Sequence, residues 1–244
     1  MLDDLGLKWP LGRPIQRLME WQVGQSSSGS GESDRQTRLK SALIENSVAS
    51  TSALVSFLAA LYRYSPDTLA HVQRVAATSV CIGGGMSLSR EELRHLERAA
   101  LAHDLGRVVA PDRSDEQPTG PAFDEAYRGR QAALARDVLS VAPGMRRAAD
   151  IIGAQFERID GSGWPSGLQG DEIPVGARIV GVADAYDALT SLCLELGLSA
   201  DAIAVELVRH AGTRFDARVV AACLRWMDES PVGVPSTNHG ERLM

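Results

Sequence analysis

The sequence predicts an all-α fold, and three observations support that prediction. Apolar residues recur at helical spacing over most of the chain from residue 34 onward, and no long window alternates apolar with polar residues. Two of the apolar runs follow helix-start patterns, Ser65-Pro66 in one case and a capping box from Ser89 to Glu92 in the other. Aromatic residues are only 5% of the chain, so the core must consist mainly of small aliphatic side chains, which suit closely packed helices.

The individual elements follow from this periodicity and from the residues that interrupt it. Ser65-Pro66 ends a long first helix, and a glycine cluster ends the second. The helix after Ser89 carries His103-Asp104 at its C-terminal end, and we expect Gly106 to break it. Proline and glycine predict loops at 111–121 and 160–174. The expected helices are residues 43–64, 66–82, 90–105, 122–141, 144–158, 175–192, 199–212 and 216–229.

The chain divides into three regions by composition. Residues 1–33 form an N-terminal amphipathic segment followed by a Gly/Ser-rich linker, and this segment is expected to dock on the main domain or on a partner protein. Residues 34–229 form the helical domain, and residues 230–244 form a polar tail.

Charge and cysteine content restrict the classes of function. The net charge of -6 argues against binding to duplex nucleic acid, although a local arginine cluster with a metal could still bind phosphate. No apolar run reaches membrane-spanning length, so membrane insertion is not expected, and the acidic N-terminus lacks a signal-peptide pattern. The three cysteines Cys81, Cys193 and Cys223 lie far apart in apolar surroundings, which predicts buried free thiols and a cytoplasmic location.

The dipeptide His103-Asp104 is the first candidate for chemistry. An imidazole nitrogen and a carboxylate oxygen are ordinary ligands of divalent transition metals. A single His-Asp pair is weak support, because many such pairs only face solvent at a helix surface. His71 and Asp184 supply two further potential ligands of the same kinds.

The order His71, His103-Asp104, Asp184 resembles the HD superfamily of metal-dependent phosphohydrolases. The stretch FERIDGSGWPSGLQGDEIPVGARIVGVADAYDAL, residues 156–189, resembles its HD-GYP branch, and the resemblance covers about residues 60–228. It implies an all-helical domain that holds two or three metals, often iron or manganese. It also implies hydrolysis of cyclic di-GMP.

The resemblance also implies roles for individual residues. It makes His71, His103, Asp104 and Asp184 the ligands of a first metal, with Asp104 and Arg107 as catalytic residues. It places Arg107, Arg178 and Trp164 at the bound ligand; Trp164 stands where the branch has tyrosine. For Arg107, an exposed cation at a helix C-terminus is an equally good interpretation.

The sequence departs from the branch at the second metal. The positions of three expected histidines carry Gln131, Gln155 and Phe156, and neither an amide nor a phenyl ring is a good ligand for iron or zinc. Glu157 retains its carboxylate and is interpreted as a ligand, a base near the site or an acid at a helix surface. We therefore expect one divalent metal per chain, iron or manganese.

Two functional hypotheses follow. In the first, the chain is a divergent HD-GYP-like phosphohydrolase of cyclic di-GMP phosphodiesterase ancestry, acting on a cyclic dinucleotide or another nucleotide phosphate. In the second, it is a catalytically degenerate domain that binds a nucleotide or a protein partner, the latter through residues 1–33. A purely structural helical domain fits less well, because buried charges are costly without a partner.

Overall fold

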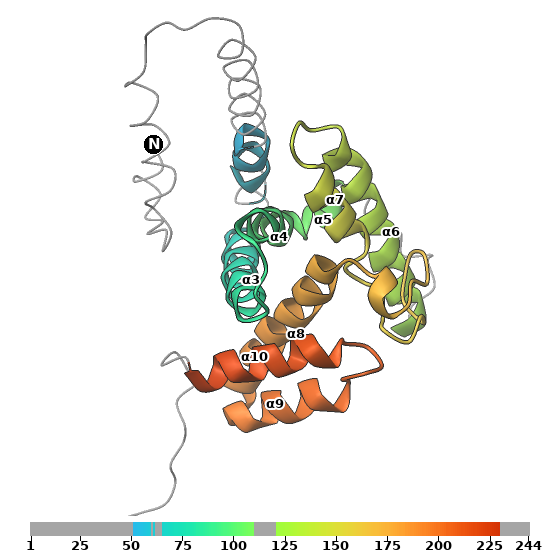
Figure 1. The fold of residues 1–244 in the computed structure, drawn as a ribbon. Helices are drawn as coiled ribbons and strands as arrows, with labels where there is room; N and C mark the ends of the chain where they lie inside the picture. Colours follow the sequence, from blue (N-terminus) through green and yellow to red (C-terminus); the bar gives the residue numbers. More distant parts are fainter. Residues whose placement is uncertain (1–50, 60, 62–64, 110–120, 230–244) are drawn as a thin grey trace, which may run out of the picture. The chain divides into compact units, whose positions relative to one another are not determined.

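The computed structural model describes residues 51–59, 61, 65–109 and 121–229 of the chain. Helices joined by loops make up this part (Figure 1), and its β-type backbone pairing is confined to two isolated bridges. The predicted all-α fold is therefore confirmed. Within the same ranges, no helix combines the length and the apolar composition needed to cross a bilayer.

Residues 51–59 are helical and lie within the predicted helix 43–64. Most of the rest of that predicted helix falls outside the described ranges. Residues 1–50, 110–120 and 230–244 also fall outside them. The named elements follow in chain order. They are α3 (Pro66–Gly85), α4 (Arg90–Ala102), α5 (Leu105–Val109), α6 (Pro121–Ser140), α7 (Arg146–Gly153), the 3-10 turn η2 (Gly170–Glu172), α8 (Val175–Leu196), α9 (Ala200–Arg209) and α10 (Ala217–Glu229).

Both predicted helix starts are present. The Ser65 hydroxyl accepts a hydrogen bond from the Thr68 amide at 3.2 Å, and Pro66 is the first helical residue of α3. At α4 the Ser89 hydroxyl accepts from the Glu92 amide at 3.3 Å, while the Glu92 carboxylate accepts from the Ser89 amide at 2.8 Å. These reciprocal bonds satisfy amide groups that the first turn of a helix leaves free.

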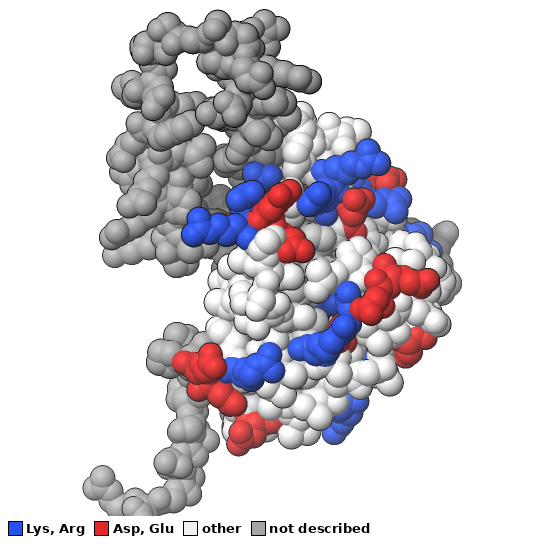
Figure 2. Space-filling view, in the orientation of Figure 1, with Lys and Arg blue, Asp and Glu red and all other residues white. Residues whose placement is uncertain are grey.

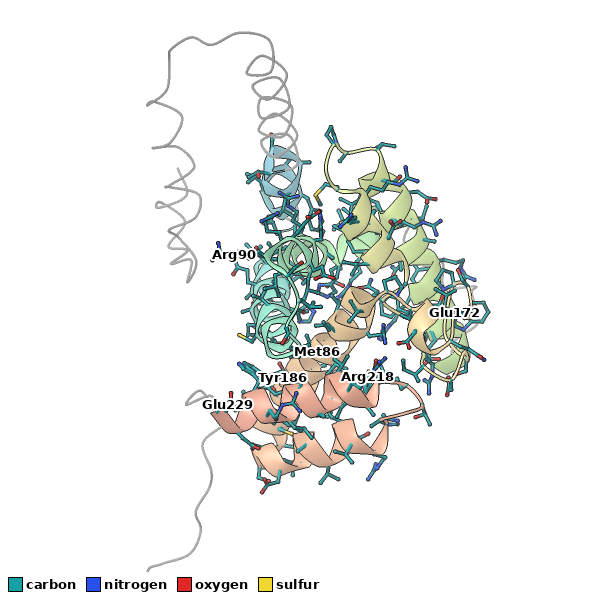
Figure 3. All side chains as sticks on the ribbon, in the orientation of Figure 1. Met86, Arg90, Glu172, Tyr186, Arg218 and Glu229 are labelled. Atoms are coloured by element: carbon teal, nitrogen blue, oxygen red, sulfur yellow. The ribbon has the colours of Figure 1, made fainter. Side chains whose placement is uncertain are left out.

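Helix α8 is the element around which the candidate site is built, because it contacts α3, α4, α7, α9 and α10. Its inner face buries Ile179 and Val180 completely, and burial of such a side chain contributes about 1.5–3 kcal/mol. Further along, the ring of Tyr186, which is labelled in Figure 3, lies edge-on to Trp226 of α10, with centroids 5.4 Å apart. Since α3 also packs on α4 and α10, the middle of α8 meets α3 and the end of α4.

The predicted break at Gly106 is wrong. Helix α4 ends at Ala102 and α5 begins at Leu105, so the interruption falls at His103-Asp104 and Gly106 lies inside α5. A Cβ atom at position 106 would collide with the backbone carbonyl of Gln131 in α6. The glycine therefore serves the close packing of α5 on α6 rather than helix termination.

Two other expectations are also corrected. Helix α7 ends at Gly153 and does not reach residue 158, because Gln155 and Glu157 turn into the interior and bond to backbone groups there. Cys193 and Cys223 are buried as predicted, but Cys81 is exposed. Helical periodicity explains this, since Cys81 shares the outer face of α3 with the exposed residue Ala77.

Candidate metal centre

Two histidines and two aspartates converge where α3, α4 and α8 meet. His71 lies in α3, His103 caps the C-terminus of α4 with Asp104 next to it, and Asp184 lies in α8. The Nε2 atoms of His71 and His103 are 3.2 Å apart. Asp184 Oδ1 lies 3.3 Å from His71 Nε2 and 3.8 Å from His103 Nε2, and Asp104 Oδ1 lies 3.8 Å from His103 Nε2. Potential ligand atoms of His71, His103 and Asp104 all lie within 4.8 Å of one another.

Hydrogen bonds orient both imidazoles toward this point. His103 Nδ1 donates to the carbonyl oxygen of Ala100 at 2.7 Å, which leaves the lone pair on Nε2. His71 Nδ1 lies 2.8 Å from Asp187 Oδ2, so it too directs Nε2 inward. A carboxylate or carbonyl behind a ligating histidine is the usual arrangement at metal sites, because it fixes the tautomer and the ring orientation.

The donor set fits a divalent cation. Two carboxylates at these separations from two facing imidazole nitrogens favour a positive charge among them. In the metal-free protein they favour protonation of His71. Burial acts to lower the pKa of His71, but the hydrogen bonds to Asp184 and Asp187 and the charges of Asp184 and Asp104 raise it to about 9. Two nitrogen and two oxygen ligands suit a transition metal such as iron or manganese.

Arg74 and Asp187 extend the site behind His71. Arg74 donates to both Asp187 oxygens, from Nε at 2.6 Å and from Nη2 at 2.9 Å. Burial acts to raise the pKa of Asp187, but the hydrogen bonds from His71 and Arg74 outweigh it and lower the pKa to about 2. Sequence reasoning missed Arg74. The signal was available, because residues 71 and 74, like 184 and 187, are three apart and share a helix face.

Replacing Asp187 by alanine should weaken metal binding by about 10–100-fold, the usual cost of losing the partner of a ligating histidine. Asp187→Asn should cost less, because its amide oxygen still accepts the His71 Nδ1 proton. Metal titration by calorimetry measures both. Glu195→Gln, an exposed change on the same helix, is the matched control. Equal affinities for the alanine variant and the control would contradict this role.

The pKa of His71 predicts how the stability of the metal-free protein depends on pH. Since the folded-state pKa is raised from 6.5 to about 9, this stabilisation is fully present below pH 6.5 and is lost as pH rises through 9. The loss should reach at most about 3 kcal/mol. Urea midpoints in EDTA between pH 6 and 9.5 measure it. The loss should be smaller in His71→Gln, which has no titrating imidazole at this position. Identical pH profiles for the two proteins would contradict the assignment.

Arg107 lies beside the cluster and contacts Asp104. Its Nη1 donates to Asp104 Oδ2 at 3.2 Å, and its side chain is 55% exposed. The guanidinium can therefore orient the carboxylate whose other oxygen faces His103. The predicted contact between Arg107 and a ligand phosphate stays a prediction.

At the positions where the HD-GYP branch holds its second metal, this chain has Gln131, Gln155, Phe156 and Glu157, and these residues make other contacts. The Gln155 side-chain amide donates to the backbone carbonyl of His103 at 3.0 Å, behind the metal cluster. Phe156 lines a neighbouring pocket, and Gln131 packs against Gly106. Among the described residues, His71, His103 and Asp104 form the one cluster of three or more potential metal ligands.

Glu157 holds the glycine-rich loop together. Its carboxylate accepts hydrogen bonds from the amides of Ser166 at 2.7 Å and Leu168 at 3.1 Å. The side chain is buried, so its interpretation as an acid at a helix surface is wrong. Gly163 is required in the same loop, because a Cβ atom there would collide with the backbone of Glu157 and Arg158.

A pocket opens beside the metal cluster, and Asp184 forms part of its wall. Four arginines also line it: Arg128, Arg158, Arg178 and Arg214. These arginines come from four parts of the chain: Arg128 from α6, Arg158 from the loop after α7, Arg178 from α8 and Arg214 from the turn before α10. The wall also holds four acidic residues, Glu125, Glu157, Asp184 and Asp216, so arginines and carboxylates alternate around the pocket. Arginines and acidic side chains are likewise interspersed on the face shown in Figure 2.

Arg178 and Trp164 were both predicted to contact ligand. Arg178 lines the pocket, but its Nη1 donates to Asp216 at 2.7 Å and to Asp171 at 2.9 Å, and its side chain is only 9% exposed. Arg218, labelled in Figure 3, joins the same two aspartates. Trp164 is 44% exposed and packs its Cβ against Gly129 of α6, outside the pocket wall.

The fold and the site define a class of domain: a helical bundle that presents a His-Asp pair at a helix end, facing further His and Asp ligands. Residues 56–219 match the HD domain family, and the chain belongs to that family. Within it, the chain is of the HD-GYP type.

Curated relatives are similar over about two thirds of this chain. It is 36% identical over 165 residues to the cyclic di-GMP phosphodiesterase response regulator RpfG of Xanthomonas campestris, covering 65% of this chain and 43% of the relative. It is 31% identical over 169 residues to the 3'3'-cGAMP-specific phosphodiesterase 2 of Vibrio cholerae, covering 68% and 32%. The chain therefore spans less than half the length of these relatives.

Solved structures share the fold. A cyclic GMP-AMP specific phosphodiesterase of V. cholerae superposes with a TM-score of 0.54 at 20% identity, covering 66% of this chain and 44% of the other. An HD-GYP-type protein from Bdellovibrio bacteriovorus, Bd1817, gives a TM-score of 0.52 at 21% identity, covering 65% and 51%.

Proposed function

We propose that this chain is a metal-dependent phosphodiesterase that hydrolyses a cyclic dinucleotide and uses one divalent metal. The observation that supports this most strongly is the convergence of His71, His103, Asp104 and Asp184 beside an arginine-lined pocket. The names of the relatives supply the substrate class, cyclic di-GMP or 3'3'-cGAMP.

In this proposal His71, His103, Asp104 and Asp184 hold the metal. When bound, a divalent metal supplies Lewis acidity and lowers the pKa of a coordinated water. Asp187 and Arg74 keep His71 Nε2 pointed at the site, and the Ala100 carbonyl does the same for His103. The arginines of the pocket neutralise phosphate charge and orient the substrate. Arg107 holds Asp104 in place.

The competing proposal is a domain that binds a cyclic dinucleotide without hydrolysing it. The packing of Gln155 favours it, because the amide bonds to the His103 backbone at a position where the branch has a metal-binding histidine. A regulatory role through a protein partner of residues 1–33, and a cytoplasmic location, both stay predictions.

Incubation with cyclic di-GMP and with 3'3'-cGAMP separates the two proposals. Purified protein with added Mn²⁺ or Fe²⁺ should convert one of them to its linear dinucleotide, as followed by chromatography, and EDTA should abolish the product. Binding of either compound by calorimetry without any product would overturn hydrolysis and favour the binding domain.

A further inference from the structure

Within the described part of the chain, two arginines of the pocket make no ion pair. Arg178 pairs with Asp216, and Arg158 Nη1 lies 3.5 Å from Glu125 Oε1. Arg128 and Arg214, by contrast, make no hydrogen bond or ion pair within residues 51–59, 61, 65–109 and 121–229, although the charge of Asp184 acts on both. The Arg214 guanidinium lies over the Phe215 ring, 4.9 Å from the ring centroid.

These two arginines come from distant parts of the chain. Arg128 lies on α6, and Arg214 lies in the turn between α9 and α10. The charge of Arg128 acts on Arg214. Burial lowers the pKa of Arg214, and the positive charges of Arg158 and Arg128 lower it further. The negative charges of Glu125 and Asp184 act to raise it, and the net effect is a lowered pKa. Placing like charges together is unfavourable unless an anion joins them.

The pocket wall offers further unused donor capacity. The Nε atoms of Arg158 and Arg178 are buried and make no hydrogen bond within the described part of the chain, although Arg158 Nε lies 3.7 Å from Asp160 Oδ1. The Arg178 side chain is itself more than nine-tenths buried while lining the pocket. Buried donors without partners are rare in folded proteins and commonly mark a place where a ligand or water binds.

We propose that Arg128 and Arg214 form a clamp that binds a phosphate group of the substrate nucleotide beside Asp184. A guanidinium donates two parallel hydrogen bonds to a phosphate, and two guanidiniums on different elements would hold the group from both sides. Because Asp184 belongs to both the metal cluster and the pocket wall, the clamp lies next to the metal site. Phe156 and Phe215 provide apolar surface in the same pocket for the nucleoside.

The identity of the nucleotide rests on the proposed function, but the recognition of phosphate does not. Inorganic pyrophosphate therefore serves as a first probe, titrated calorimetrically into the full chain in EDTA. Cyclic di-GMP under the same conditions is the second probe. The variants are Arg128→Gln, Arg214→Gln and their combination, with Arg146→Gln as control, since Arg146 is exposed at the start of α7 and outside the pocket wall.

The double variant should bind both probes at least about tenfold more weakly, because it loses charge-assisted hydrogen bonds. The salt dependence of binding should be weaker in the double variant. Its thermal unfolding midpoint should stay unchanged, and Arg146→Gln should bind both probes as the wild type does. Lysines at positions 128 and 214 should retain part of the affinity. Unchanged affinity in a folded double variant would overturn the clamp.

The clamp and the proposed function fail separately. Arginine-dependent binding of cyclic di-GMP without turnover in Mn²⁺ or Fe²⁺ supports the clamp and contradicts hydrolysis. Turnover of cyclic di-GMP with the same KM in the wild type and the double variant supports hydrolysis and contradicts the clamp.

Discussion

Changing Asp104 or Asp184 to asparagine is expected to abolish detectable metal binding and to reduce phosphodiesterase activity by well over about a hundredfold. Loss of a residue behind a metal ligand already costs 10–100-fold, and loss of a ligand itself must cost more. Asparagine preserves the shape of the side chain while removing the charge that faces His71 and His103. Metal content by elemental analysis and turnover of cyclic di-GMP measure the two effects.

Asp150→Asn is the control for this experiment, because Asp150 is an exposed residue of α7 outside the site. Both ligand variants should keep the far-ultraviolet circular dichroism of the wild type. If either retained full activity while folded, the four-residue metal set would be wrong.

Replacing Asp216 by alanine is expected to lower the free energy of unfolding by about 3–5 kcal/mol. Arg178 and Asp216 form a buried ion pair, with side chains 9% and 5% exposed, and removal of Asp216 leaves the buried Arg178 paired with Asp171, which is 78% exposed. Asp216 Oδ1 also accepts the Arg218 amide at 2.8 Å at the start of α10. Urea unfolding measures the change, provided that the dependence of the unfolding free energy on urea concentration is the same in the variant and the wild type.

Asp171→Ala provides the matched comparison, since Asp171 bonds the same Arg178 but is 78% exposed. Its loss should cost far less than the loss of Asp216, because an exposed ion pair contributes little to stability. Equal losses for the two variants would contradict the buried-pair account. A folded Arg178→Met/Asp216→Leu protein that still binds cyclic di-GMP as the wild type does would confine Arg178 to a structural role.

The helices could be predicted because their signals are local. Ser65 and the capping box of Ser89 and Glu92 mark helix starts, because each serine hydroxyl accepts a hydrogen bond from the amide three residues further on. Gly106 misled the prediction because its function is tertiary: it admits the Gln131 carbonyl of another helix. The early end of α7 has the same origin, in bonds from Gln155 to a residue far away in sequence.

The convergence of His71, His103, Asp104 and Asp184 could be predicted from their order and from the resemblance. The residues that orient them were harder to predict. Helical spacing alone could have linked Arg74 to His71, whereas nothing in the sequence indicates that Arg128 and Arg214 share a pocket. Their proximity depends on how α6 and the turn before α10 pack. Likewise, the burial that turns Glu157 inward to the Ser166 and Leu168 amides is a property of the folded loop.

The central claim is that His71, His103, Asp104 and Asp184 hold one metal ion per chain. Elemental analysis of protein reconstituted with Mn²⁺ or Fe²⁺ and freed of excess metal tests it most directly. We predict one ion per chain in the wild type and none in Asp104→Asn/Asp184→Asn. Two ions per chain, or one that persists in the double variant, would contradict the account.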